Sequence, residues 1–306
     1  MEQLMRSAQA GRIVHALLFV GPHGTGKKTM AEIMARAILC SSTGDKPCDA
    51  CPACKKCLQN LHPDVHCVAP EKNTIKVDQI RSLISDLSLA AYEGGKKIAI
   101  IEHADAMNES AQNALLKTLE NPTGDTLFFL LTDVPGALLP TIISRCLTVR
   151  FSCLEPEACA QVLISRGVEA DKANILAAAA QGSVGRALEM HADAEYPALR
   201  ARVIDAIEAL EKPQDVLRMS AQLGEAKDKA RQVLEIMELW ARDLMRVQNG
   251  MPPLQKQEQA RLAKSKHSGS GLLRCVMRAR QQLSGNLSWI HVLESMDFEL
   301  VSPKGV

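Results

Sequence analysis

The chain has 306 residues, which is more than one average domain and indicates two or three. Its charge is nearly balanced, with 36 Lys and Arg against 35 Asp and Glu, so it does not coat nucleic acid through net charge alone. Hydrophobic residues make up 46% and aromatic residues 3%, which excludes wholesale disorder and argues against an all-β sandwich or a base-stacking surface.

The first half of the chain alternates strand-like and helix-like segments. Short apolar runs predict strands, and the amphipathic segments between them predict helices on both faces of a parallel α/β sheet. We expect strands at 16–20, 65–68, 98–101, 127–131 and 147–151, and helices at 27–40, 77–89 and 109–119.

Strand-like segments end after residue 151. Short helical segments predict a small bundle, and from about residue 196 the pattern is helical almost to the end, broken where Pro, Gly and Ser gather. The small helices are expected at 155–167, 171–181 and 185–191, and the later breaks at 212–213, 250–253 and 268–271. The plan is an α/β domain over 1–152 with a cysteine-rich insertion at 40–57, followed by helical domains at 153–195 and 196–306.

The location of the protein bears on its cysteines. No apolar run approaches the roughly 20 residues that a membrane span needs, and no basic segment with an apolar core opens the chain, so we expect a cytoplasmic protein without a membrane partner. In this reducing compartment the ten cysteines should not form a disulfide framework, and a cluster of them indicates a metal site.

A glycine-rich loop joins the first predicted strand to the first predicted helix. It reads Gly21-Pro22-His23-Gly24-Thr25-Gly26-Lys27 and matches the G-x-x-x-x-G-K pattern in its required context. Backbone N–H groups of such a loop point at phosphate, and its lysine reaches the outer phosphates. A turn that binds nothing is the alternative interpretation, but strand, spacing and lysine together predict a phosphate loop.

The residue after Lys27 departs from the pattern of a hydrolysing enzyme. Such enzymes carry a Ser or Thr hydroxyl there for Mg²⁺, whereas this chain has Lys28. Thr29 is one residue later, a rotation of about 100° on a helix, so its hydroxyl should point away from the metal. The loop therefore favours binding of ATP or ADP without efficient hydrolysis.

A second departure lies at the end of the strand predicted at 98–101. Hydrolysing enzymes end this strand with Asp-Glu, where the Asp holds Mg²⁺ and the Glu polarises the attacking water. This chain has Glu102-His103-Ala104-Asp105. An imidazole can take a proton, but loss of the catalytic pair is the simpler interpretation, with Asp105 expected to cap the next helix.

Five cysteines lie within eighteen residues. Cys48, Cys51, Cys54 and Cys57 form three consecutive C-x-x-C spacings, and Cys40 precedes them at the end of a predicted helix. The cluster predicts a structural zinc site closed by four thiolates. A redox pair would account for only two of these thiols. The spacing leaves open which four of the five bind zinc.

Together these features resemble the delta-prime family of bacterial DNA polymerase III clamp-loader subunits, which are AAA+ proteins. The matching segments are residues 15–21, the phosphate loop, the cysteine cluster, His62-Pro63-Asp64, residues 114–122 and Ser144-Arg145-Cys146. The specific motifs cover roughly residues 10–190. The resemblance implies a P-loop AAA+ module with a parallel sheet, a small helical lid domain and a C-terminal, all-helical oligomerisation collar.

The resemblance also implies roles for single residues. Cys40, Cys48, Cys51 and Cys54 match the family's zinc ligands, with Cys57 as an extra thiol. Arg145 matches an arginine finger that reaches into a neighbouring subunit's ATP site. Thr132 matches a polar sensor beside the phosphates, and the arginine of Gly182-Ser183-Val184-Gly185-Arg186 matches one that contacts nucleotide. The expected nucleotide-contacting residues are then Gly21, Gly24, Thr25, Gly26, Lys27, Lys28, Thr29, Glu102, Thr132 and Arg186.

The function implied by the resemblance is that of a non-motor subunit. It would assist a neighbouring ATPase and help to load the sliding clamp on primed DNA during replication, with no catalysis of its own within the DNA-directed DNA polymerase holoenzyme. The implied partners are the tau/gamma and delta subunits, the sliding clamp and, through the assembly, primed DNA. The alternative is an ATP-hydrolysing tau/gamma-type clamp loader. A DNA-binding zinc protein is disfavoured because Lys55-Lys56 has no aromatic stacking partners.

Overall fold

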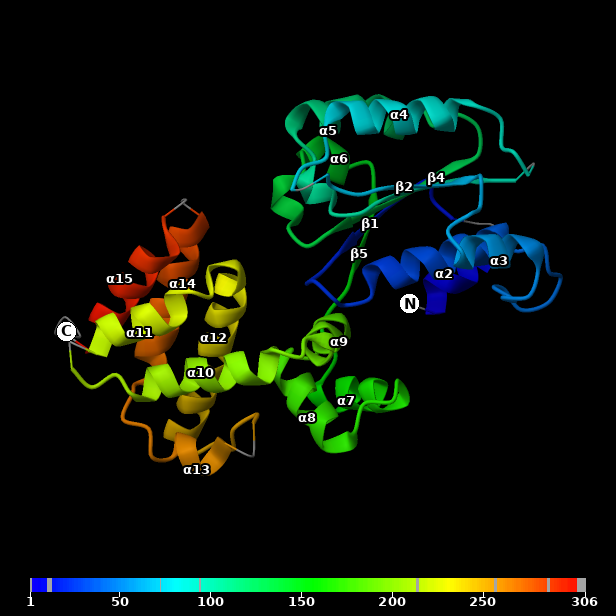
Figure 1. The fold of residues 1–306 in the computed structure, drawn as a ribbon. Coiled ribbons are helices and arrows are strands. Elements are labelled where there is room, and N and C mark those ends of the chain that lie inside the picture. The colour runs from blue at the N-terminus through cyan, green and yellow to red at the C-terminus, as the bar shows by residue number, and fades with distance from the viewer. Residues whose placement is uncertain are drawn as a thin grey trace. The chain divides into compact units, whose positions relative to one another are not determined.

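The computed structural model describes residues 2–9, 13–71, 73–93, 95–212, 215–255, 258–284 and 287–301. The chain divides into two units, Met1–Cys153 and Leu154–Val306. The first unit is an α/β unit and the second is helical (Figure 1). No helix among the described residues is long and apolar enough to span a membrane.

A five-stranded parallel sheet organises the first unit, with the strand order β2-β3-β4-β1-β5. Every residue of the three inner strands is buried, which explains why they read as continuous apolar runs in the sequence. The expected strands and the α/β fold class are confirmed. The strands are β1 (Ala16–Val20), β2 (Val65–Val68), β3 (Lys97–Ile101), β4 (Thr126–Thr132) and β5 (Leu147–Arg150).

Helices cover both faces of this sheet, and each face has its own hydrophobic core. One core packs residues of α4, α5 and α6 against the sheet, and the other packs α2 against the opposite face (Figure 1). The helices are α1 (Glu2–Gln9), α2 (Lys27–Leu39), α3 (Pro52–Leu58), α4 (Val77–Ser88), α5 (Glu109–Glu120) and α6 (Pro140–Ile143), with short 3-10 turns η1 (Ala104–Ala106) and η2 (Pro135–Ala137).

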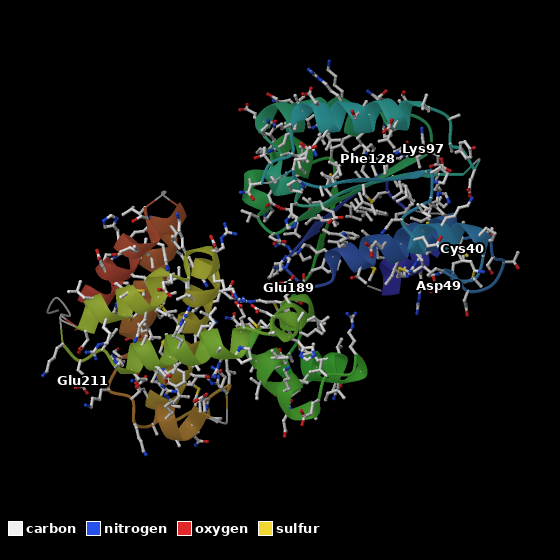
Figure 2. The ribbon with its side chains drawn as sticks, in the orientation of Figure 1. Cys40, Asp49, Lys97, Phe128, Glu189 and Glu211 are labelled. Carbon is white, nitrogen blue, oxygen red and sulfur yellow. The ribbon has the colours of Figure 1, made fainter. Side chains whose placement is uncertain are left out.

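Two labelled side chains show how the sheet is secured (Figure 2). Phe128 is fully buried at the centre of the sheet. Lys97, also buried, begins β3, and its ammonium donates hydrogen bonds to the carbonyls of Leu87 and Leu89. A buried ammonium needs such acceptors, and here it satisfies carbonyl groups at the C-terminal end of α4.

The second unit is helical throughout its described residues. One hydrophobic cluster runs from α7 to α15 and surrounds Trp240, which is fully buried and donates its indole N–H to Glu208. The elements are α7 (Pro156–Ser165), α8 (Ala170–Ala179), α9 (Val184–Ala192), α10 (Tyr196–Glu208), α11 (Asp215–Gly224), η3 (Lys227–Lys229), α12 (Ala230–Gln248), α13 (Gln259–Leu262), α14 (Gly269–Ser284) and α15 (Trp289–Val301).

The predicted breaks in this region need one correction. The loop at 250–253 is confirmed, and the break at 212–213 falls partly outside the described residues because Pro213 is not among them. The break at 268–271 is predicted too late in the chain, because the loop after α13 covers residues 263–268 and α14 begins at Gly269. A β-carbon at this glycine would lie 2.7 Å from the carbonyl oxygen of Ala241, so the glycine permits α14 to approach α12 closely.

Candidate functional site

The predicted phosphate loop lies at the carboxyl edge of the sheet, where ligands of open α/β folds bind. Gly21 follows β1, Glu102 follows β3, and Thr132 ends β4. The register pairs Val20 with Thr132, and the N–H of Gly21 donates to the Thr132 carbonyl at 3.2 Å. Parallel pairing thus brings segments far apart in the sequence to one edge.

Glycine is required at several points of this loop. A β-carbon on Gly21 would lie 2.2 Å from the carbonyl oxygen of Phe151. Gly24 and Gly26 have φ angles of 74° and 88°, which side chains disfavour, and Gly26 is the N-cap of α2. The Thr25 hydroxyl donates to the Pro22 carbonyl at 2.8 Å. The loop conformation therefore accounts for the spacing of its glycines.

Lys27 is bonded entirely within the protein. Its ammonium donates to the carbonyls of Gly21 (2.7 Å) and Pro22 (2.8 Å) and forms an ion pair with Asp133 at 2.8 Å. These three contacts equal the number of donors on an ammonium group. Asp133 was missed by sequence reasoning, although its position directly after Thr132 at the strand end was an available signal. Contact of Lys27 with phosphate would require an exchange of these partners.

The two departures from the hydrolysing pattern meet in space. The ammonium of Lys28 lies 2.9 Å from a carboxylate oxygen of Glu102. This hydrogen bond raises the pKa of Lys28, against the opposing effect of its partial burial. In a hydrolysing P-loop enzyme both positions serve Mg²⁺. Here they bind each other. Thr29, the next residue, is exposed on α2.

Asp105 and Thr132 form a further polar contact at this edge. The Thr132 hydroxyl donates to Asp105 at 2.7 Å and accepts the N–H of Val134 at 3.1 Å. The prediction that Asp105 caps the next helix is wrong. Asp105 lies in η1, and Asn108 is the N-cap of α5, with its side chain accepting the N–H of Ala111. The intervening 3-10 turn shifts the start of the helix.

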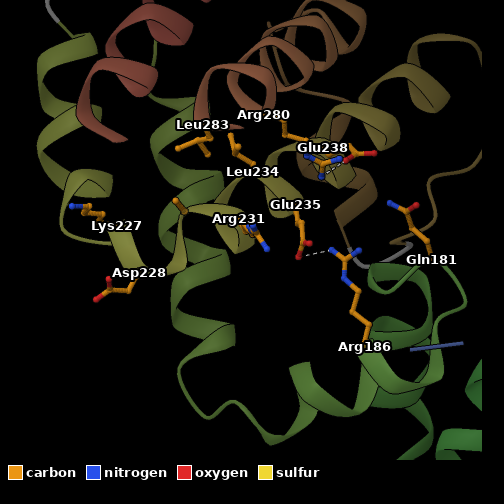
Figure 3. Close-up of a pocket in the computed structure, with 11 residues that line it drawn as sticks. Gln181, Arg186, Lys227, Asp228, Arg231, Leu234, Glu235, Glu238, Arg280 and Leu283 are labelled. Atoms are coloured by element: carbon orange, nitrogen blue, oxygen red, sulfur yellow. Dashed lines mark ion pairs between the residues drawn. The ribbon is translucent and has the colours of Figure 1, made fainter. Parts of the chain in front are cut away.

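Arg186 lies on α9 of the second unit. Its guanidinium forms an ion pair with Glu235 of α12 at 2.6 Å (Figure 3). Both line a cavity of about 650 Å³, together with Lys227, Arg231 and Arg280. The side chain expected to contact nucleotide thus joins two helices of its own unit.

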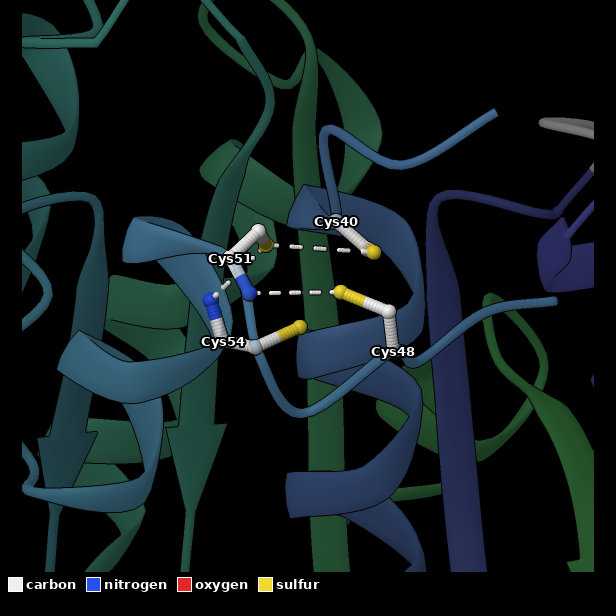
Figure 4. Close-up of side chains that lie close together, drawn as sticks. All are labelled: Cys40, Cys48, Cys51 and Cys54. Atoms are coloured by element: carbon white, nitrogen blue, oxygen red, sulfur yellow. Dashed lines mark hydrogen bonds between the residues drawn. The ribbon is translucent and has the colours of Figure 1, made fainter. Parts of the chain in front are cut away.

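Four cysteine sulfurs gather at the end of α2 (Figure 4). The Sγ atoms of Cys40, Cys48, Cys51 and Cys54 lie within 4.8 Å of one another. Tetrahedral zinc with bonds of about 2.3 Å would place its sulfurs about 3.8 Å apart. The observed Cys40–Cys51 separation is 3.9 Å. Number, chemistry and spacing of the thiols therefore fit a structural zinc ion.

Backbone N–H groups are directed at two of the four sulfurs. The N–H groups of Cys51 and Cys54 point at the sulfurs of Cys48 and Cys51, respectively. Hydrogen bonds from the backbone of Cys54 and Ser41 lower the pKa of Cys51 to about 5, whereas burial raises that of Cys54 to about 12. Cys57 lies outside the cluster, on α3, and burial raises its pKa to about 11.

Polar side chains brace the segments around the cysteines. Arg36 of α2 pairs with Asp49 in the cysteine loop at 3.4 Å. The His62 imidazole lies 3.4 Å from Glu93, and the buried carboxylate of Asp64 accepts the N–H groups of Tyr92 (2.6 Å) and Glu93 (3.0 Å). The His62-Pro63-Asp64 segment therefore holds the loop before β3.

Arg145 lies in the turn between α6 and β5. Its side chain is one-third exposed (34%). One terminal nitrogen donates to the Thr141 carbonyl at 3.0 Å, and the other forms an ion pair with Glu120 at the end of α5. Glu120 was not singled out from the sequence, although it belongs to the segment 114–122 that carried the resemblance.

The parallel sheet, with a G-x-x-x-x-G-K loop at its carboxyl edge and a helical unit after it, defines an α/β protein of the P-loop class. A family model described as DNA polymerase III, delta subunit, matches residues 1–155. DNA polymerase III subunit delta' of Bacillus subtilis is 34% identical over 97% of this chain and 93% of its own length. The chain belongs to the delta' subunit family of DNA polymerase III.

Two further similarities extend this comparison. DNA polymerase III subunit tau of Bacillus subtilis is 35% identical over 58% of this chain and 32% of the tau chain. A solved structure of a DNA polymerase III gamma subunit-related protein from Thermotoga maritima is 16% identical, covers 98% of this chain and 99% of that chain, and has a TM-score of 0.49.

Proposed function

We propose that this chain is a non-motor subunit of the DNA polymerase III clamp loader, and that it supplies Arg145 in trans to the ATP site of a neighbouring tau/gamma-type subunit. Family membership supports its place in the polymerase assembly. The observation that carries the non-motor role is the ion pair between Lys28 and Glu102.

This ion pair opposes hydrolysis within the chain. Phosphoryl transfer in P-loop enzymes needs Mg²⁺ held beside the β- and γ-phosphates by the loop hydroxyl and a strand-end carboxylate. Lys28 cannot ligate a cation, and its positive charge neutralises Glu102. ATP or ADP would meet the loop N–H groups and Lys27, after Lys27 leaves Asp133, but the metal would have no pair of ligands at these two positions.

Arg145 has the chemistry of a residue that acts on a neighbour. Its charge is fixed, and its planar donors match the oxygens of a γ-phosphate on which charge develops. Its exposure and its place in a short turn support access by a second subunit. The role in trans is our assignment from these properties and from the family.

The remaining features complete the proposal. Four thiolates of the cysteine cluster hold a structural zinc ion that stiffens residues 40–57, and this closed site leaves no position for catalytic water. The α/β domain (1–152) carries the loop and Arg145, a lid follows at 153–195, and a collar at 196–306 assembles with the tau/gamma and delta subunits. The cytoplasmic assembly then places the sliding clamp on primed DNA.

The test is ATP turnover by the reconstituted clamp loader with Arg145→Ala in this chain. We expect turnover at the adjacent site to fall by about 10³-fold or more, the range for arginine fingers, so that the assembly loses that site's share of the total rate. Arg150→Ala is the matched control, because Arg150 is an exposed arginine on β5. An Arg145→Ala assembly with unchanged turnover would reject the trans role.

The second candidate is an ATP-hydrolysing tau/gamma-type subunit. The intact G-x-x-x-x-G-K loop and the similarity to a tau subunit favour it. It requires Mg²⁺-dependent turnover by the isolated chain, which the Lys28–Glu102 pair opposes.

A further inference from the structure

We infer that Glu120 is a positioning residue for Arg145, fixing the plane of its guanidinium before a neighbouring phosphate arrives. This inference rests on the proposed trans role of Arg145. The proposed function gives a role to Arg145 alone, and this inference adds the Glu120 carboxylate to it.

The backbone that carries Arg145 is fixed. The N–H of Arg145 donates to the Ile142 carbonyl at 3.1 Å, and Ile142 is fully buried in the core shared with α5. Gln112 of α5, also buried, accepts the N–H of Leu139 at 2.7 Å and donates to the Ala137 carbonyl. The segments on both sides of α6 are thereby anchored, and α5 and α6 lie side by side (Figure 1).

The side chain of Arg145 is held at two points. Thr141 accepts from one terminal nitrogen and Glu120 from the other, so both ends of the planar group are oriented. A guanidinium has five N–H donors, and these contacts use two of them. Among the described residues no other partner engages Arg145, which leaves three donors for an incoming anion. Two fixed points on a planar group remove most of its rotational freedom.

The position of Glu120 is not explained by stability. It is the last residue of α5, where a carboxylate opposes the helix dipole. Its side chain is 44% exposed, and exposed ion pairs contribute little to folding. The contact therefore acts mainly on the geometry of Arg145. A charged acceptor also makes a stronger hydrogen bond than a neutral one, so the carboxylate holds the planar guanidinium of Arg145 more firmly than an amide would.

The experiment uses the reconstituted clamp loader and defines Arg145-dependent turnover as the difference between wild-type and Arg145→Ala assemblies. We expect Glu120→Ala to lower this component roughly three- to tenfold in kcat, with KM for ATP changed less than about twofold, because orientation rather than ATP binding is lost. Glu120→Gln should lie between Glu120→Ala and wild type, since its amide oxygen still accepts. The control is Glu109→Ala, which removes a carboxylate at the other end of α5 and should leave turnover unchanged.

A double variant separates positioning from structural damage. Glu120→Ala should have no further effect in the Arg145→Ala background, and thermal unfolding should show that each variant folds. Unchanged or increased Arg145-dependent turnover in Glu120→Ala would overturn the inference, as would a loss that persists without Arg145. If Arg145→Ala has no effect, the proposed function fails and this inference fails with it. A large effect of Arg145→Ala on turnover, together with no effect of Glu120→Ala, rejects the positioning role of Glu120 and leaves the trans role of Arg145 supported.

Discussion

Substitution of Lys28 and Glu102 measures the coupling free energy of their ion pair, the contact on which the non-motor role depends. Their charged atoms are 2.9 Å apart, and Coulomb's law in bulk water gives about 1.4 kcal/mol for unit charges at this distance. The Lys28 side chain is 59% exposed, so the entropy of holding it reduces the expected coupling to about 0.5–1 kcal/mol. Each single variant should lower the free energy of unfolding by this amount. The double variant should lower it by the same amount and not by twice as much.

The assay is a double-mutant cycle of Lys28→Ala, Glu102→Ala and the double variant, followed by circular dichroism in urea. Intrinsic tryptophan fluorescence is unsuitable, because Trp240 and Trp289 are both in the second unit. Because Glu102 raises the pKa of Lys28 above 10.5, the coupling should be complete from neutral pH up to pH 10.5 and lost as pH rises through the folded-state pKa of Lys28. A coupling energy near zero at neutral pH would refute this account of the site.

Three further predictions address the zinc site and the second unit. Cys51→Ser should abolish bound zinc, measured as metal per chain, whereas Cys57→Ser should retain it; equal loss from both variants would contradict the assignment of ligands. Gly269→Ala should destabilise the second unit by about 1–3 kcal/mol, because the added β-carbon meets the backbone of α12; an unchanged urea midpoint by fluorescence would refute this close packing. Arg186→Ala should cost less than about 1 kcal/mol through loss of the Glu235 ion pair and should leave nucleotide affinity unchanged by calorimetry; a large loss of affinity would instead place this arginine at a nucleotide.

The sheet could be predicted because the sequence patterns that specify its strands and its phosphate loop each lie within a few consecutive residues. Each inner strand is a short, fully buried apolar run, and the glycines of the phosphate loop are required by positive φ angles or by the close approach of Phe151. Such constraints act within a few residues. The α-helix at Pro52–Leu58 was not predicted, because its seven residues are mostly cysteine and lysine and show no apolar periodicity.

The contacts within the site were less accessible to sequence reasoning. Lys28 and Glu102 were each recognised as departures, but they come together only because β1 and β3 pair in parallel with opposite sides of β4. Spacing alone did not separate Cys40 from Cys57 as the fourth thiol. The short helix α3 resolves this geometrically, because it begins after Cys51 and carries Cys57 in its last turn, outside the cluster. Asp105 and Asn108 are both good N-cap residues, but Asp105 lies inside the 3-10 turn η1, so Asn108, which follows this turn, caps α5.

The most direct test of the central claim, that this chain assists ATP hydrolysis and does not perform it, is Mg²⁺-dependent ATP turnover by the isolated, repurified chain, measured beside its Lys27→Ala variant. The account predicts no turnover above background and no difference between the two proteins. Turnover that survives repurification and disappears with Lys27→Ala would contradict it and assign the chain to the ATP-hydrolysing class.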